Sequence, residues 1–205
     1  MKYSTFDRVT FLYDFIVKYI LKDDIKSMNL LEKYLVFNKN HKLIDIGGGT
    51  GAISKMMLNK IDFINILDPS PNLLSNVKCH EISLILASGT SIPIRDNTYD
   101  LALLIETLHH INEKLHEKIL TESYRVINQG GKLFIIDLSR PDDIFKRIYS
   151  RIDQFTSGGK IYFKNPIELK EILERIGFIK IDIFQPMKNS LKKKQDWRYV
   201  IIATK

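Results

Sequence analysis

A run of glycines directly after a short apolar segment constrains the fold of this chain more than any other feature. Residues 42–46 have the sequence KLIDI, which is typical of a buried strand, and residues 47–51 have the sequence GGGTG. Glycines in this position let the backbone turn sharply and approach a ligand closely. They also leave the N–H groups of the next helix available to an anionic group. The run Gly47–Ala52 also satisfies the dinucleotide-binding pattern G-x-G-x-x-G/A, with Asp68 about 20 residues further on. A tight turn with no ligand is the simpler alternative.

Short apolar segments alternate with helical segments between residues 42 and 138. The expected strands are 42–46, 63–68, 82–87, 100–105 and 132–138, and the expected helices are 53–58, 72–77 and 112–128. Apolar strands without period-2 alternation, separated by helices, are typical of a parallel sheet covered on both faces. Because crossovers between parallel strands are right-handed, this order predicts a doubly wound α/β fold.

The two ends of the chain depart from this alternation. Residues 6–37 carry apolar side chains at helical spacing, which predicts two N-terminal helices. A further helix is expected at 166–176, with Pro166 in its first turn and Gly177 after its end. Segments 178–184 and 198–204 are expected to be strands, and because no helix fits between them they predict an antiparallel hairpin.

Positive charge is concentrated in the C-terminal third. The 205 residues include 31 Lys or Arg and 24 Asp or Glu, a formal net charge of +7. Residues 1–140 are close to neutral, whereas residues 141–205 carry 14 basic and 8 acidic residues. The segment Lys188–Lys194 alone contains four lysines. A solvated lysine-rich surface is one interpretation, and an anionic partner or acceptor is the other.

The remaining composition indicates a cytoplasmic protein. The single cysteine, Cys79, excludes an internal disulfide and fits a reducing compartment. The N-terminus lacks the small-residue cleavage site of a signal peptide, and no apolar run approaches the ~18 residues needed to span a bilayer. No Cys, His and Asp spacing matches a zinc site, so no metal is expected.

Four ordered motifs together resemble the class I S-adenosylmethionine-dependent methyltransferases. They are LIDIGGGTG (43–51), ILDPSPNLL (66–74), IPIRDNTYDLALLIETLHHI (92–111) and YRVINQGGKLFIID (124–137). Within that class they look most like the group that includes the ubiquinone and menaquinone biosynthesis methyltransferases. The resemblance is close over residues 6–137 and looser to residue 205.

The resemblance implies a Rossmann-like methyltransferase fold with seven strands, N-terminal helices and a C-terminal antiparallel hairpin. It also implies S-adenosyl-L-methionine as the cofactor. We expect one domain over residues 1–205. Its expected parts are an N-terminal helical cap (1–40), a cofactor-binding core (41–138), a lid insertion (139–165) and a closing helix with the hairpin (166–205). Aromatic residues of the insertion are candidates for lining an acceptor pocket, although ordinary core packing is the simpler role for most of them: Phe145, Tyr149, Phe155, Tyr162 and Phe163.

The same resemblance assigns cofactor contacts. Asp45 would hold the ammonium group of the cofactor, and Asp68 would accept from both ribose hydroxyls. The other expected contacts are Gly47, Gly48 and Gly49 to the methionyl part and Pro69, Ser88 and Gly89 to the adenine. The family often has Gly-Asp-Ala where this chain has Ala87-Ser88-Gly89, so Ser88 offers a hydroxyl in place of a carboxylate. Capping a turn is the simpler role for both aspartates.

Residues after the fourth expected strand are the candidates for catalysis. Glu106 is placed beside the methionine moiety, and His109 and His110 belong to an LHH element common in the family. A structural role for the histidines is favoured, with one packing under the loop and one capping the next helix, although histidine titrates in the range useful for a base. Tyr13 is placed over the cofactor or substrate, with core packing as an equal alternative. No catalytic residue is identified.

The cofactor dictates the reaction expected of such a chain. A sulfonium methyl is already activated, so the protein must mainly hold an acceptor in line, ~3–3.5 Å away, in a dry site. We expect a small organic acceptor, anionic or aromatic or isoprenoid. One alternative is an RNA or protein methyltransferase that uses the basic C-terminal third. The others are a nicotinamide-dependent reductase and a non-catalytic cofactor-binding regulator.

Overall fold

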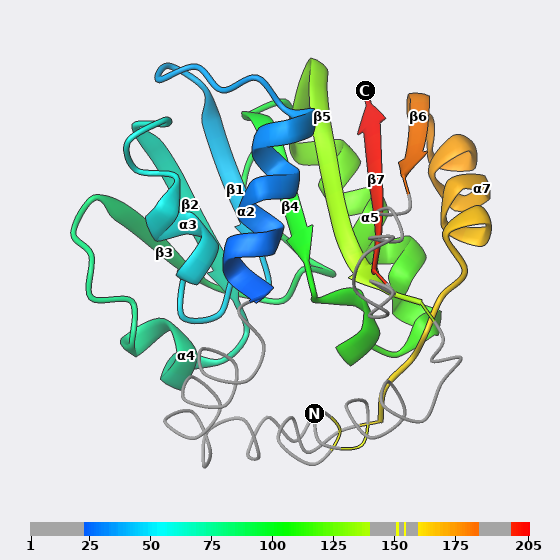
Figure 1. Cartoon of the computed structure of the whole chain (residues 1–205), viewed down its shortest axis with the longest axis horizontal. Coiled ribbons are helices and arrows are strands. Elements are labelled where there is room, and N and C mark those ends of the chain that lie inside the picture. The colour runs from blue at the N-terminus through cyan, green and yellow to red at the C-terminus, as the bar shows by residue number, and fades with distance from the viewer. Residues whose placement is uncertain (1–22, 140–150, 152–153, 155–159, 185–197) are drawn as a thin grey trace, which may run out of the picture.

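One seven-stranded sheet organises the part of the chain that the structure describes. The structure is a computed structural model, and it describes residues 23–139, 151, 154, 160–184 and 198–205. The strands are β1 (Lys42–Ile46), β2 (Phe63–Asp68), β3 (Ile82–Leu86), β4 (Tyr99–Ile105), β5 (Ile127–Leu138), β6 (Ile179–Phe184) and β7 (Arg198–Thr204). Their order across the sheet is β3-β2-β1-β4-β5-β7-β6 (Figure 1).

The strand directions confirm the expected fold. β1 is parallel to β2 and β4, β2 is parallel to β3, and β4 is parallel to β5. β7 is antiparallel to both of its neighbours, β5 and β6. The sheet is therefore a doubly wound α/β sheet with a C-terminal antiparallel hairpin. Because the strand order reverses between β1 and β4, the carboxyl ends of these two strands are where such a fold binds its ligand.

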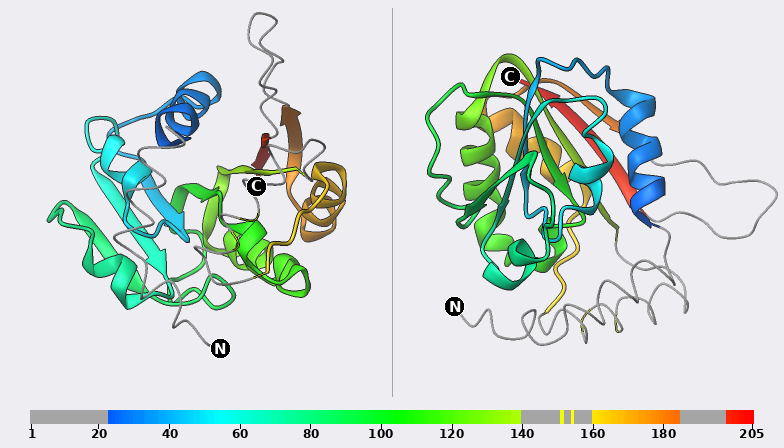
Figure 2. Two further views of the ribbon diagram at one scale, coloured as in Figure 1. Left: turned by 60° about the horizontal axis from the view of Figure 1, so that its bottom comes forward. Right: turned by 90° about the vertical axis from the view of Figure 1, so that its left-hand side faces the viewer.

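Helices cover the sheet on both faces (Figure 2). They are α2 (Asp23–Tyr34), α3 (Ala52–Met56), α4 (Pro71–Ser75), α5 (His116–Val126) and α7 (Pro166–Ile176), with two 3₁₀ turns, η2 (Leu108–His110) and η3 (Glu113–Leu115). α5 and α7 pack on one face, and α2 and α3 pack on the other. Residues from β1, β4, β5 and β7 contribute alternately to the two apolar clusters, as the period-2 geometry of a strand requires.

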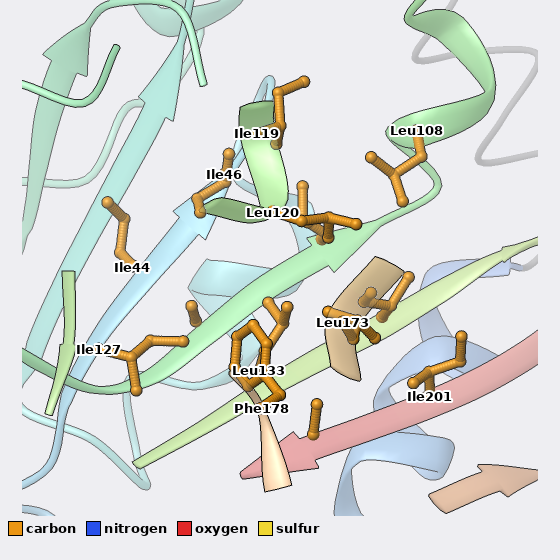
Figure 3. Packing of buried hydrophobic residues seen from close by; sticks show 14 of the residues in the cluster. Ile44, Ile46, Leu108, Ile119, Leu120, Ile127, Leu133, Leu173, Phe178 and Ile201 are labelled. Carbon is orange, nitrogen blue, oxygen red and sulfur yellow. The ribbon is translucent and has the colours of Figure 1, made fainter. Parts of the chain in front are cut away.

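The apolar cluster under α5 and α7 holds the side chains that fix the middle of the sheet. Ile46 and Leu133 of the sheet lie near Leu120 of α5 and Leu173 of α7 (Figure 3). All four side chains are at most 2% exposed. Burial of a Leu or Ile side chain contributes about 1.5–3 kcal/mol to folding, so this cluster stabilises the packing of α5 and α7 on the sheet.

The helix expected at 112–128 is shorter in the structure than the sequence pattern predicts. Asn112 caps η3 by accepting a hydrogen bond from the backbone N–H of Lys114 (3.0 Å), and α5 then runs only from His116 to Val126. Ile127 already belongs to β5 and pairs with Tyr99. A register shift then lets residues 128–131 join the strand although they are polar or glycine.

Several expectations lie outside the described residues. These are the first N-terminal helix with Tyr13, the greater part of the lid insertion with Phe145, Tyr149 and Phe155, and the lysine-rich segment Lys188–Lys194. The division of the chain into a cap, a core, a lid and a closing unit therefore stays a prediction.

Candidate active site

Most of the expected cofactor-binding residues meet at one edge of the sheet. Asp45 and Asp68 lie at the carboxyl ends of β1 and β2, and Ser88 and Glu106 follow the ends of β3 and β4. In a doubly wound sheet these ends border one crevice. The structure thus places the residues together where a ligand is expected, and their individual contacts with the cofactor remain proposals.

The glycine loop after β1 packs directly against the end of β4. Gly47 has a left-handed backbone with φ of +76°, and a side chain there would collide with Thr107. At Gly48 an added Cβ would lie 2.6 Å from the carboxyl carbon of Asp45. Because neither position accommodates a side chain without movement, the loop presents bare backbone beside the Asp45 carboxylate.

Asp45 is a buried carboxyl group with a raised pKa. Its residue is 3% exposed, and Oδ2 accepts a hydrogen bond of 2.7 Å from the Ser54 hydroxyl in α3. Loss of hydration on burial raises the pKa from the ordinary 3.8 to about 6, the negative charge of Asp68 adds to the rise, and the Ser54 hydrogen bond opposes it. A carboxylate held in this way is stabilised by a nearby cation, so the residue suits a ligand ammonium group.

Asp68 ties the glycine loop to the second strand. Oδ2 accepts the backbone N–H of Gly49 (3.1 Å), and Oδ1 accepts that of Ser70 (2.8 Å). Burial raises the pKa of this carboxyl group, and these two hydrogen bonds oppose the rise. Asp68 therefore does cap the turn before α4. Each carboxylate oxygen can accept more than one hydrogen bond, so this role is compatible with binding the two hydroxyls of a ribose.

Ser88 and Gly89 are held by contacts within the protein. The hydroxyls of Ser88 and Thr90 lie 2.9 Å apart, and Ser88 Oγ also accepts the backbone N–H of Thr90 (3.3 Å). An added Cβ at Gly89 would lie 3.0 Å from Ile46. This turn follows β3 directly, so Ser88 lies at the same edge of the sheet as Asp45 and Asp68.

The two adjacent histidines have different surroundings. His109 is 3% exposed, its ring Nδ1 lies 2.5 Å from Asp137 Oδ1, and its backbone N–H donates to Asp137 Oδ2 (3.2 Å). The ring of His110 packs on that of His109 with centroids 4.0 Å apart. His109 thus packs under the loop, as the structural alternative anticipates. A third histidine, His116, contacts the loop before α5. The carbonyls of Leu108 and Ile111 in that loop both accept from its Nε2, each at 2.9 Å.

Asp137, His116 and Ser54 were not predicted from the sequence. Asp137 ends the motif YRVINQGGKLFIID, so its position near a strand end was a usable signal. His116 and Ser54 carried no such signal because each acts through a contact that only the folded loop creates.

Arg198 is the other residue that the sequence did not reveal. β7 is antiparallel to β5 and pairs Arg198 with Leu138, so its first residue lies at the carboxyl edge. Nη1 of Arg198 is 3.5 Å from Oε1 of Glu106 and 3.4 Å from the Ser27 hydroxyl in α2. Glu106 has a left-handed backbone with φ of +51°, which is uncommon for a residue with a side chain.

Of the expected pocket aromatics, Tyr162 and Phe163 are described. The backbone N–H of Tyr162 donates to the carbonyl of His109 at 2.8 Å, which fixes this segment over the turn after β4. Within the described ranges, no three His, Cys, Asp or Glu side chains are grouped so that they could hold a metal ion. The helices described in the structure are all too short or too polar to cross a membrane.

Comparisons with known proteins agree with this architecture. Residues 44–135 match a family model described as a methyltransferase domain. An uncharacterized protein of Methanocaldococcus jannaschii is 32% identical over 147 residues, 71% of this chain and 59% of the relative. The ubiquinone/menaquinone biosynthesis C-methyltransferase UbiE of Wigglesworthia glossinidia brevipalpis is 29% identical over 151 residues, 64% of this chain and 60% of the relative. A solved methyltransferase from Thermotoga maritima has a TM-score of 0.78 at 17% identity, over 98% of both chains.

The fold is that of class I S-adenosylmethionine-dependent methyltransferases, and residues 44–135 are similar to a methyltransferase domain. These similarities support S-adenosylmethionine as the cofactor. Within the class, the chain resembles the UbiE group of ubiquinone and menaquinone biosynthesis methyltransferases. The chain spans 59% of the length of the M. jannaschii relative and 60% of that of the W. glossinidia relative.

Proposed function

We propose that this chain transfers the methyl group of S-adenosylmethionine to a small organic acceptor that is anionic, aromatic or isoprenoid. The observation that carries the proposal is the placement of two buried aspartates, Asp45 and Asp68, on either side of a glycine loop at the switch point of the sheet. Relatives named as ubiquinone/menaquinone biosynthesis C-methyltransferases support an aromatic acceptor. The chain's cytoplasmic location and its choice of acceptor remain predictions.

The described residues fit the cofactor on physical grounds. In this proposal Asp45 binds the ammonium group, the backbone of Gly47–Gly49 faces the methionyl part, and Asp68 accepts from the ribose hydroxyls. The space beside Gly48 is one that a Cβ would fill against Asp45. The cofactor supplies an activated methyl group, so the protein must mainly bind, orient and exclude water.

A general base is required only if the acceptor must lose a proton. His109 is almost fully buried against Asp137, so we assign it to the support of the loop. Glu106 and His110 lie at the edge and are partly exposed. They remain the candidates for contact with the acceptor.

Calorimetry with three ligands tests the cofactor. S-adenosylmethionine and S-adenosylhomocysteine are expected to bind, and NAD is expected not to bind. Tighter binding of NAD would favour a reductase and contradict the proposal.

A methyl-transfer screen with radiolabelled S-adenosylmethionine tests the acceptor. The panel contains quinone precursors, small phenols, amines and total RNA. Label transferred to a quinone precursor or a phenol supports the proposal. Label recovered only in RNA supports the alternative of an RNA methyltransferase, and binding without transfer to any acceptor supports a regulator.

A further inference from the structure

A buried cation lies at the carboxyl edge of the sheet, on the face covered by α2. Arg198 begins β7, and the side chain is 3% exposed. Val200 and Ile202, two and four residues further along the strand, belong to the apolar cluster under α2 and α3. Because alternate residues of a strand share a face, Arg198 points to that side, where it contacts Ser27 of α2.

The pair formed by Arg198 and Glu106 is loose compared with another arginine pair in the same protein. Arg125 holds Glu122 through two hydrogen bonds of 2.8 Å, Nε to Oε1 and Nη2 to Oε2. Among the described residues, Nη1 of Arg198 lies 3.5 Å from Oε1 of Glu106. Bidentate, short pairs between guanidinium and carboxylate are the strong ones, so the Arg198–Glu106 contact is the easier of the two to exchange.

Glu106 is suited to such an exchange. The side chain is 25% exposed, so the carboxylate can regain water when it leaves Arg198. Its backbone is fixed, since the N–H donates to the carbonyl of Ile136 (2.7 Å) and the left-handed φ of +51° holds the residue at the end of β4. Left-handed residues that carry a side chain cost about 1–2 kcal/mol and cluster at functional sites.

We propose that Arg198 binds the oxyanion of the methyl acceptor, a carboxylate or a phosphate, and that this oxyanion displaces Glu106, one of the partners of Arg198 in the acceptor-free protein. This inference rests on the proposed function. A guanidinium group matches both oxyanions with two parallel hydrogen bonds, and it stays charged at any pH of interest. In a site shielded from water, the guanidinium discriminates against neutral acceptors because its charge is then left without the oxyanion. Arg198 is a specificity-determining residue in this arrangement.

The test measures binding of matched probes to the protein saturated with S-adenosylhomocysteine. The probes are 4-hydroxybenzoate with 4-hydroxybenzamide, and phenyl phosphate with phenol. The unmodified protein is expected to bind at least one charged probe about 10–100-fold more tightly than its neutral counterpart, as hydrogen bonds to a charged group imply. The two pairs distinguish a carboxylate from a phosphate.

Three variants separate recognition from a structural role. Arg198→Gln is expected to abolish the preference for the charged probe and to leave S-adenosylhomocysteine affinity within about twofold. Glu106→Gln removes the competing carboxylate and is expected to strengthen binding of the charged probe several-fold. Arg175→Gln, on α7 and with its side chain 58% exposed, is the control and should change neither quantity. If Arg198→Gln does not fold, the opposite sign expected for Glu106→Gln keeps the proposal testable.

Several results would overturn the proposal. These are equal binding of charged and neutral probes, failure of both charged probes to bind, and a preference that survives Arg198→Gln. A fourth is loss of S-adenosylhomocysteine affinity in Arg198→Gln with unchanged affinity for 5′-methylthioadenosine, because Arg198 would then bind the carboxylate of the cofactor. If S-adenosylhomocysteine does not bind the unmodified protein, the proposed function itself fails.

Discussion

Charged residues at the two edges of the sheet differ in burial and in how they are paired. At the amino edge, Arg125 pairs with Glu122 and Asp96 at 2.7–2.8 Å and donates to the carbonyls of Ile92 and Ile94. Lys205 Nζ lies above the ring of Tyr124 (4.5 Å) and donates to the backbone carbonyls of residues 124 and 127. These groups close the ends of α5, β5 and β7 with short contacts inside the protein.

At the carboxyl edge the charged residues are more buried and electrostatically less favourable. Burial raises the pKa of both Asp45 and Asp68, whereas hydrogen bonding to Arg125 lowers that of Glu122. An acid whose charged form is disfavoured in the folded protein costs stability, and such groups mark functional sites. The comparison assigns fold stabilisation to the amino edge and agrees with the ligand site that we propose at the carboxyl edge.

The largest expected effect is on cofactor binding at the carboxyl edge. Asp68→Asn removes the charged acceptor for two ribose hydroxyls, and we expect S-adenosylhomocysteine affinity to fall about 100-fold, or about 3 kcal/mol. Calorimetry measures this change.

The matched control for this variant is Asp100→Asn at the amino edge. Asp100 accepts from the Lys42 backbone and the Asn128 side chain, both at 2.8 Å. This control is expected to leave cofactor affinity unchanged. Equal losses in the two variants would contradict the assigned difference between the edges.

The next effect is on stability at the amino edge. Arg125→Ala removes two carboxylate pairs and two carbonyl contacts, so we expect the free energy of unfolding to fall by about 2 kcal/mol. Urea denaturation measures it, with S-adenosylhomocysteine affinity expected to stay within about twofold. The exposed Arg175, 3.4 Å from Glu117, provides the control, and Arg175→Ala should cost less than about 0.5 kcal/mol. A large loss of cofactor affinity in Arg125→Ala would show that the two edges are not separate.

The smallest expected effect is a pH dependence that arises from Asp45. Its pKa is about 6 in the folded protein against the ordinary value of 3.8. Between these values the folded state binds a proton that the unfolded state does not, so the contribution of Asp45 to stability falls as the pH rises from about 4 to 6 and is then constant. Binding an ammonium group needs the carboxylate, so cofactor affinity should change in the opposite sense and rise about tenfold from pH 5 to pH 7.

Calorimetry and thermal unfolding at pH 5, 6 and 7 check both trends. Asp45→Asn serves as the reference, since its profile retains every other titrating group. If the two proteins have identical pH profiles, Asp45 does not cause either trend.

The sequence predicted the strands well because each strand coincides with a local run of apolar residues. Each of the strands expected at 42–46, 63–68 and 198–204 has the expected bounds, and Pro166 and Gly177 delimit α7. The predicted start of β5 at residue 132 was wrong, because residues 128–131 also join the strand through contacts with residues distant in the sequence. Among these are the pairing of Gly130 and Gly131 with the backbone of Lys205 and the hydrogen bond from Asn128 to Asp100.

In the candidate site, too, the sequence could place some residues and not others. Asp45 and Asp68 could be placed from the ends of apolar runs, and the structure brings them to the expected edge. Arg198 could not be placed, since its contact with Ser27 joins residues 171 positions apart. The pairing of His109 with Asp137 likewise depends on two strand ends that meet only in the folded sheet.

The position of β7 has a consequence for biosynthesis. β7 follows β6 in the chain but lies between β5 and β6, and residues 199–203 are at most 8% exposed. When only residues 1–197 have been synthesised, β5 has no partner strand on the side that β7 will occupy. Leu133, Phe134 and Ile135 lie on that unpaired edge. Unpaired apolar edges of this kind are prone to aggregate before folding is complete. The sheet can therefore close only after residues 198–204 have left the ribosome, and premature termination in this segment is expected to yield insoluble chains.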